Sequence, residues 1–297
     1  MKIAILSRSK SIEVLSLKEE GEKEGHSVDI IDPKKLVFTI FKNTFEIYTD
    51  TGVNILSYDA YIPRYFGITT GKYRKNSKGL VVRYLTDHNK IVLDSIEGKR
   101  FSQEGKIFSF SKYLESGLSL IPTLYLYSQN LDKLDQLLKE HNISSPYILK
   151  DIKGVQGKNI YKVNSKDEIT NIIKKNVNIH FMIQPFIGIE HDLRILVLGD
   201  KILGCMDKIH KNNDFKGNIA QGAIGVPFNI TNDIIKISNI ARFRNGADFC
   251  GVDIAITKDT TYLLEVNRSP QYKGFMNATG INVSKEIIKY LEYLYVL

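Results

Sequence analysis

Cysteine is scarce in this chain, and long uninterrupted apolar stretches are missing. Only Cys205 and Cys250 occur among the 297 residues, each within an apolar run, which indicates buried thiols of a reducing compartment and excludes a disulfide framework. The apolar stretch at residues 1–6 is too short for a signal peptide, and the longest one, residues 118–127, contains Ser and Pro and cannot cross a bilayer. We therefore expect a soluble, cytoplasmic protein.

Familiar signatures of nucleotide binding and nucleophilic catalysis are also missing. The glycine fingerprint of dinucleotide-binding domains does not follow the first apolar segment, where Ser7-Arg8-Ser9 stands instead. No convincing Ser-His-Asp or Cys-His arrangement is present. The first part of the chain is therefore not expected to hold the nucleotide.

Positive charge, in contrast, is in excess. Lys and Arg number 41 against 33 Asp and Glu, a formal net charge of +8, which favours anionic partners such as nucleotide phosphates, an acidic substrate or nucleic acid. Lysines are spread along the whole chain, and only residues 72–75 form a dense basic cluster. Nucleic-acid binding would rest on charge alone, because no zinc-knuckle spacing or other nucleic-acid signature accompanies it, so we regard the charge mainly as a general surface property.

Alternating strand and helix signals open the chain and predict an α/β fold. Residues 3–6 form a buried type of strand, a helix follows to about residue 24, and residues 28–31 form the next strand. Such alternation indicates a parallel sheet with helices on its faces. The polar residues 87–103 mark a boundary, and 297 residues are enough for two domains or for one lobed domain.

Further elements follow from the same kinds of pattern. Those that we predict are a hairpin around residues 42–44, a strand at 60–63 that ends at its proline, a helix at 131–142, strands at 147–150, 159–163 and 181–187, a hairpin at 192–206, and helices at 234–241 and 283–294.

Two apolar runs near the C-terminus, residues 251–256 and 262–267, predict a further hairpin. Alternate strand residues share a face, so Glu265 and Asn267 project the same way. If the register places Asp253 opposite them, three oxygen-bearing side chains converge, which is the donor set that Mg²⁺ prefers. The alternative is an ordinary hairpin with a solvated polar face. Three oxygen groups in apolar surroundings favour the metal site.

A glycine-bearing basic loop lies between the strands at 147–150 and 159–163. Lys150 ends the first strand, and Gly154, Gly157 and Lys158 follow in the loop. Glycines let the backbone approach a ligand and lysines neutralise it, so the loop has the composition of a flap over phosphates. Its spacing is not that of a P-loop. A plain hairpin with a polar tip explains the loop at least as well on this pattern alone.

The strand at 181–187 leaves its sheet at a proline, in the segment Gln184-Pro185-Phe186-Ile187. Free backbone groups at such an exit suit an adenine edge, although an ordinary edge strand fits equally well. Asp192 and Arg194 share one face of the next strand. They form either a bracing ion pair or ligands for a ribose and a phosphate.

The order of these features resembles the ATP-grasp superfamily and, within it, the RimK-type α-L-glutamate ligases. The resemblance covers nearly the whole chain, is weakest at residues 67–101, and is strengthened by residues 1–8, 59–64, 216–218, 273–275 and 278–283. It implies an N-terminal parallel-sheet domain at residues 1–95, a central ATP-grasp lobe with the flap at 96–187, and a C-terminal lobe with the metal site at 188–297. ATP would be gripped between the last two.

The resemblance also implies roles for single residues. Contacts to ATP would come from Lys106, Lys150, Gly157, Lys158, Gln184, Pro185, Phe186, Ile187, Asp192, Lys216 and Asn218. One or two Mg²⁺ (or Mn²⁺) ions would be held by Asp253, Glu265 and Asn267. Arg194, Lys208 and Arg268 would act in catalysis, and Arg64 would help to place a carboxylate substrate.

The implied reaction needs no side-chain nucleophile. A substrate carboxylate attacks the γ-phosphate of ATP, and an amine then attacks the acyl phosphate to give an amide, ADP and phosphate. Catalysis would come from positioning and charge neutralisation. The partners implied are ATP, a small amino acid such as glutamate, and a carboxylate-bearing peptide, protein tail or cofactor; a homo-oligomer is compatible with this, a membrane is not expected.

Three positions depart from the family pattern. Pro185 and Gln221 stand where an acidic and a basic residue are common, and Asp207-Lys208 stands where paired arginines are usual. Lys208 keeps one charge without the bidentate geometry of arginine. The alternative function is therefore a non-catalytic ATP-binding regulatory or scaffold homologue. The retained set of Asp253, Glu265 and Asn267 favours the enzyme.

Overall fold

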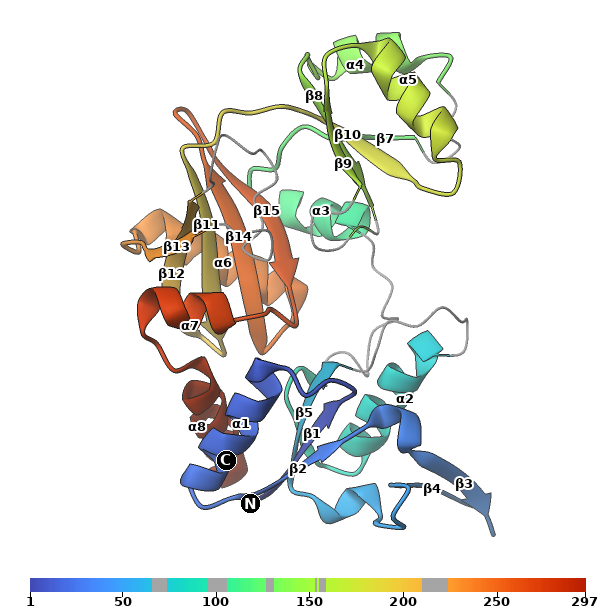
Figure 1. Cartoon of the computed structure of the whole chain (residues 1–297), viewed down its shortest axis with the longest axis vertical. Helices are drawn as coiled ribbons and strands as arrows, with labels where there is room; N and C mark the ends of the chain where they lie inside the picture. Colours follow the sequence, from blue (N-terminus) through green and yellow to red (C-terminus); the bar gives the residue numbers. More distant parts are fainter. Residues whose placement is uncertain (66–73, 96–105, 127–130, 153, 155–158, 210–223) are drawn as a thin grey trace.

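The computed structural model describes residues 1–65, 74–95, 106–126, 131–152, 154, 159–209 and 224–297 (Figure 1). Its strands form three larger sheets and one two-stranded ribbon. The three sheets correspond to an N-terminal lobe, a central lobe and a C-terminal lobe, so the mixed α/β architecture predicted from the sequence is confirmed. None of the helices in the described ranges is both long enough and apolar enough to cross a membrane.

The N-terminal lobe contains the predicted parallel sheet, with strand order β2-β1-β5-β6. Its strands are β1 (Lys2–Ser7), β2 (Ser27–Ile31), β5 (Ala60–Tyr65) and β6 (Ile91–Val92). Helix α1 (Ile12–Lys23) packs on one face, and α2 (Arg74–Asp87) covers the other. Residues 3–6 of β1 are wholly buried, as expected for a central strand covered on both faces.

One predicted boundary in this lobe is wrong. The strand expected to end at Pro63 continues to Tyr65. Pro63 is tolerated because β6 pairs only with Ala60 and Tyr61, so β5 has no neighbouring strand among the described residues on that side at the proline.

The predicted hairpin around residues 42–44 forms the two-stranded ribbon of β3 (Val37–Phe41) and β4 (Thr44–Tyr48). Lys42 and Asn43 both adopt positive φ angles, 45° and 64°, which is the conformation of a tight two-residue hairpin turn. Phe45 anchors the ribbon by an edge-to-face contact with Tyr84 of α2. Short 3₁₀ turns, Pro33–Lys35 and Ile55–Ser57, flank the ribbon.

The central lobe is an antiparallel sheet with the order β7-β10-β8-β9. Its strands are β7 (Leu124–Tyr125), β8 (Tyr147–Asp151), β9 (Ile160–Val163) and β10 (Phe181–Pro185). Two helices, α4 (Leu134–Glu140) and α5 (Lys166–Lys175), complete a core of its own. Strand β10 is shorter than the predicted 181–187, because the chain leaves the ladder at Pro185.

The C-terminal lobe is an antiparallel sheet with the order β13-β12-β11-β14-β15. Its strands are β11 (His191–Leu198), β12 (Lys201–Ile209), β13 (Ile224–Pro227), β14 (Phe249–Ile256) and β15 (Thr261–Asn267). Helices α3 (Lys106–Leu114) and α6 (Asn232–Asn245) cover one face of the sheet.

The other face of this sheet joins the N-terminal lobe. Residues before and within α7 (Lys273–Thr279) and α8 (Val283–Val296) pack between the two sheets, so Tyr272, Phe275 and Ile287 share one core with Ile3 and Ile5. The N-terminal and C-terminal lobes therefore form one packed body, and the central lobe stands above it in Figure 1.

Candidate active site

A row of polar side chains crosses the sheet of the C-terminal lobe. Arg194 of β11 is the register partner of Asp253 of β14, which is in turn the register partner of Glu265 of β15. The alternation of strand residues places Asp192, Lys208 and Asn267 on the same face. This face buries Leu196, Met206 and Phe249 elsewhere in the sheet, so the polar row begins where the apolar core ends.

A β-bulge makes this row possible. Ile254 pairs with Leu263, but Asp253 pairs with Glu265, so Leu264 is an extra residue on β15. Without the extra residue, Asp253 would pair with Leu264, and Glu265 would project from the opposite face. The bulge thus satisfies the condition under which the sequence predicts three converging oxygen groups.

Buried ion pairs link the row. Arg194 donates to both oxygens of Asp253, from Nε to Oδ1 at 2.9 Å and from Nη2 to Oδ2 at 2.7 Å. Lys208 Nζ lies 2.5 Å from Asp192 Oδ1 and 3.4 Å from Asp253 Oδ1. Asp192, Lys208 and Asp253 are each less than a tenth exposed. Asp192 forms an ion pair with Lys208, and Arg194 forms one with Asp253. The contacts of Asp192 and Arg194 with a ribose and a phosphate stay a prediction.

The charges of the row stabilise one another. Burial raises the pKa of Asp253, but the nearby Arg194 and Lys208 charges lower it further, so the net pKa lies below its ordinary value. The Asp253 carboxylate in turn raises the pKa of Arg194. Asp253 and Arg194 are consequently both charged at neutral pH. Such a buried cluster is costly to desolvate, which points to a functional site more than to a stabilising device.

The donor set fits a hard divalent cation. Asp253 and Glu265 supply carboxylate oxygens and Asn267 an amide oxygen, and Asn267 Oδ1 accepts a hydrogen bond from the Ser269 amide at 3.0 Å. Carboxylate and amide oxygens each have two lone pairs, so these contacts leave acceptor capacity. Within the described ranges no group of three His, Cys, Asp or Glu side chains could hold a metal, so this mixed set is the candidate.

Asp207 and Lys208, which stand where paired arginines are usual in the family, project to opposite faces of the sheet. Lys208 joins the polar row, whereas Asp207 projects to the opposite face. There Asp207 Oδ2 lies 2.6 Å from His191 Nδ1, and its Oδ1 accepts from the Asp192 amide at 3.1 Å. Asp207 therefore braces the strand pair, and only Lys208 adds charge to the site.

Of the segment predicted to leave the sheet, residues 184–187, only Ile187 lies beyond the pairing and hydrogen bonds of the described residues. Gln184 is buried and donates to Thr123 Oγ1 at 2.8 Å, and the Phe186 amide donates to the Pro146 carbonyl at 2.6 Å. Lys162 Nζ lies 3.5 Å from the centre of the Phe186 ring. Among the described residues, no backbone hydrogen bond involves Ile187, Gly188 or Ile189.

Of the residues predicted to contact phosphates, the structure describes some and leaves others outside the described ranges. Lys150 lies in β8 opposite Met182 of β10, one residue before the strand ends, and Lys106 is the first residue of α3. The Gly154 amide donates to Asp151 O at 3.0 Å. Gly157, Lys158, Lys216, Asn218 and Gln221 lie outside the described residues.

Arg64 and Arg268 are not brought into the row. Arg64 is 5% exposed, donates from Nη2 to the Pro270 carbonyl at 2.8 Å, and lies over the Tyr272 ring. Arg268 donates to the side chain and the carbonyl of Asn245. Asn245 carries no sequence signal of this role, and no local pattern could have identified it, since it lies 23 residues before Arg268.

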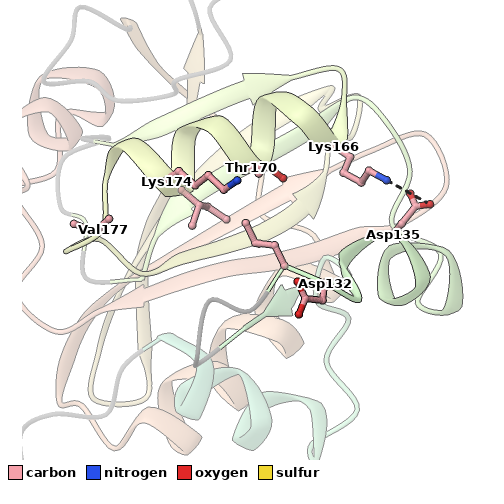
Figure 2. A pocket seen from close by; sticks show the side chains of 8 residues that line it. Asp132, Asp135, Lys166, Thr170, Lys174 and Val177 are labelled. Atoms are coloured by element: carbon pink, nitrogen blue, oxygen red, sulfur yellow. Dashed lines mark ion pairs between the residues drawn. The ribbon is translucent and has the colours of Figure 1, made fainter.

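A separate groove lies on the central lobe, between the start of α4 and one face of α5 (Figure 2). It has a volume of about 560 Å³, and Asp135 and Lys166 form an ion pair of 3.7 Å at its edge. The residues that line it are Leu131, Asp132, Asp135, Lys166, Thr170, Ile173, Lys174 and Val177. None of them belongs to the polar row.

Comparison with protein families gives two matches that together span most of the chain. A RimK-like ATP-grasp domain matches residues 116–291, and a RimK PreATP-grasp domain matches residues 1–92. A probable alpha-L-glutamate ligase of Halorhodospira halophila is 28% identical over 298 residues, covering 98% of this chain and 95% of that protein. One from Legionella pneumophila strain Corby is 27% identical with the same coverage.

Solved structures of similar fold include two proteins bound to precursors. The ATP-grasp ligase PsnB, complexed with a minimal precursor variant, Mg and ADP, superimposes with a TM-score of 0.79 at 16% identity, covering 99% of this chain and 98% of that one. The macrocyclase MdnC of Microcystis aeruginosa, bound to its precursor peptide MdnA, gives a TM-score of 0.74 at 16% identity, covering 99% and 100%.

Proposed function

The chain belongs to the RimK-like ATP-grasp family, the ATP-dependent carbon–nitrogen ligases, and on that premise we propose that it adds glutamate or a similar amino acid to a carboxylate-bearing acceptor. The acceptor would be a peptide, a protein tail or a cofactor. The proposal agrees with the names of its relatives, probable alpha-L-glutamate ligases, and with the peptides bound to its structural neighbours.

The single observation that supports it most is the row from Arg194 through Asp253 to Glu265. Three carboxylates and two cations lie on one sheet face, three of these charged residues are less than a tenth exposed, and the oxygen donors fit a divalent cation. A group of this kind serves phosphate chemistry, in which negative charge must be bound and spread while the phosphoryl group moves.

Asp253, Glu265 and Asn267 would hold Mg²⁺, which supplies charge neutralisation and orientation of the phosphates when it is bound. Lys208 and Arg194 would add fixed positive charge at the same face. The open backbone at residues 187–189 would bind the adenine edge, and Lys150 and Lys106 would contact phosphates. Asp253, Lys208 and Arg194 are preorganised by their strands and ion pairs, so little reorganisation of these groups is needed during the reaction.

The reaction would proceed in two displacements. A carboxylate oxygen of the acceptor attacks the γ-phosphorus of ATP, the bond to the bridging oxygen breaks, and ADP leaves. The amine of the incoming amino acid then attacks the acyl phosphate carbon, inorganic phosphate leaves, and the amine loses a proton. The products are an amide, ADP and phosphate.

The test is a phosphate-release screen of the purified protein with ATP and Mg²⁺ against amino acids and glutamate-ended acceptor peptides. We expect release that requires both co-substrates, with a mass increase of one amino-acid residue in the acceptor. Failure to bind ATP would overturn the ATP-grasp assignment itself.

A second candidate is a regulatory ATP-binding protein without ligase activity. It is favoured by Lys208, which stands in place of an arginine and is engaged by both Asp192 and Asp253. Tight ATP binding without amino-acid-dependent release across the whole screen would support this candidate over the ligase.

A further inference from the structure

Arg268 directly follows the strand that carries Glu265 and Asn267, yet its guanidinium contacts α6, which covers the opposite face of the sheet. Its Nε donates to Asn245 Oδ1 at 2.6 Å, and its Nη2 donates to the Asn245 carbonyl at 2.7 Å. Asn245 is the last residue of α6. Carbonyls at the C-terminal end of a helix lack helical partners and carry the negative end of its dipole, so they favour a cation.

Asn245 in turn connects the Arg268 contact to helix α3. Asn245 Nδ2 donates to Tyr113 Oη at 3.0 Å, and both side chains are buried. Burial raises the pKa of Tyr113 to about 12, so its hydroxyl is neutral at ordinary pH and accepts this bond. Tyr113 belongs to α3, whose first residue is Lys106. Hydrogen bonds thus connect the end of β15, through α6, to the helix that begins with a candidate phosphate ligand.

The segment after β15 is also held from the N-terminal lobe. Arg64 Nη2 donates to the Pro270 carbonyl at 2.8 Å, and Ser269 Oγ donates to the Arg64 carbonyl at 3.2 Å. Pro270 packs on Gly251, the register partner of Asn267, so closely that a Cβ at Gly251 would lie 3.0 Å from Pro270 Cβ. The segment 267–270 is therefore fixed from several directions.

We propose that Arg268 is a positioning residue that acts through Asn245 and Tyr113 to hold Asn267 and Glu265 in place for the metal-bound nucleotide. Because the Ser269 amide orients the Asn267 side chain, a displacement of this segment would turn the amide oxygen away from its neighbours. The inference rests on the proposed function, in which these two residues hold Mg²⁺. It gives Arg268 a role that involves no contact with the substrate.

The test compares the affinity of a fluorescent ADP analogue in Mg²⁺ and in EDTA. The dissociation constant in EDTA divided by that in Mg²⁺ measures the metal-dependent part of binding. General destabilisation does not change this ratio. We expect Arg268→Ala to reduce this ratio about 10-fold or more, the effect of roughly one lost hydrogen bond to a charged group. Arg268→Lys, which can make one of the two contacts, should restore part of it. Tyr113→Phe, which keeps the packing, should reduce it about 2- to 5-fold, the effect of one neutral hydrogen bond.

A matched control is Arg242→Ala. Arg242 also lies on α6 and donates to a carbonyl just beyond the helix, Ala247 O at 2.8 Å, but its other partner is Asp200. This variant should lower the melting temperature and leave the ratio unchanged.

The outcomes separate the inference from its premise. A wild-type protein whose ADP affinity is the same in Mg²⁺ and EDTA would contradict both the proposed metal site and the positioning role of Arg268. A normal wild-type ratio that is retained in Arg268→Ala would overturn only the positioning role. If Arg268→Ala does not fold, unchanged ratios in Tyr113→Phe and Arg268→Lys lead to the same conclusion.

Discussion

Arg194 and Asp253 face each other across β11 and β14 and are joined by two parallel hydrogen bonds of 2.9 and 2.7 Å. Bidentate geometry of this kind fixes the orientation of both side chains. The carboxylate that is the central candidate metal ligand is thereby preorganised by a neighbour of opposite charge.

The Arg194–Asp253 pair predicts strong coupling in a double-mutant cycle. Asp253→Leu leaves the Arg194 guanidinium without its hydrogen-bonded carboxylate, so it should cost about 3–5 kcal/mol of unfolding free energy. Arg194→Met combined with Asp253→Leu should cost less than the sum of the single changes, as measured by urea denaturation. Additive effects would show that the pair contributes no specific interaction.

Glu265→Gln should abolish metal-dependent ATP turnover, by about 10²-fold or more, because it removes ligand charge with little change in shape. The measurement is phosphate release at saturating Mg²⁺, with circular dichroism as the control for folding. ATP consumption at the wild-type rate by the folded variant would show that Glu265 is not a metal ligand.

Lys150→Ala should weaken ATP binding about 10-fold or more, since a lysine at the end of a strand beside the glycine-bearing loop is expected to contact phosphate. Lys162→Ala, on the neighbouring strand, tests whether loss of any lysine in this sheet has the same effect. Bound ATP should also protect residues 151–158 from proteolysis in the wild type. If Lys150→Ala bound ATP with unchanged affinity, Lys150 would have no phosphate contact and the plain-hairpin interpretation of the loop would hold.

Arg64→Leu should lower the unfolding free energy by about 2–3 kcal/mol, because the charged hydrogen bond to Pro270 and the contact with Tyr272 are buried. The measurement is thermal and urea denaturation. The family resemblance implies instead that Arg64 helps to place a carboxylate substrate. A variant with wild-type stability and reduced amide formation would support that assignment.

Asp248 predicts a specific pH dependence. Burial raises its pKa, partly offset by the Asp94 amide, which donates to its Oδ2 at 2.7 Å. The folded protein therefore takes up this proton at a higher pH than the unfolded chain, whose Asp pKa is about 3.9. Its contribution to stability rises as the pH falls through the folded pKa and is constant below the unfolded one.

The comparison that isolates this effect is Asp248→Asn, which keeps an acceptor oxygen. Between pH 7 and pH 4 the wild type should gain stability relative to the variant. A constant difference over that range would mean that Asp248 has an ordinary pKa.

Local pattern and short-range geometry determined much of this protein from the sequence alone. The apolar residues 3–6 and the strand–helix alternation specified a parallel sheet, and alternation along β15 placed Glu265 and Asn267 on one face. These features depend on the geometry of a few consecutive residues, which is why they can be read without the fold.

Only the tertiary structure decided how these pieces meet. The bulge at Leu264 brings Asp253 opposite Glu265, and the regular pairing of the same two strands would have separated them. Arg64 reaches Pro270 across 206 residues, and Arg268 turns toward α6 instead of the substrate side. Register shifts and long-range contacts depend on packing between whole elements, and no short segment of the chain contains that information.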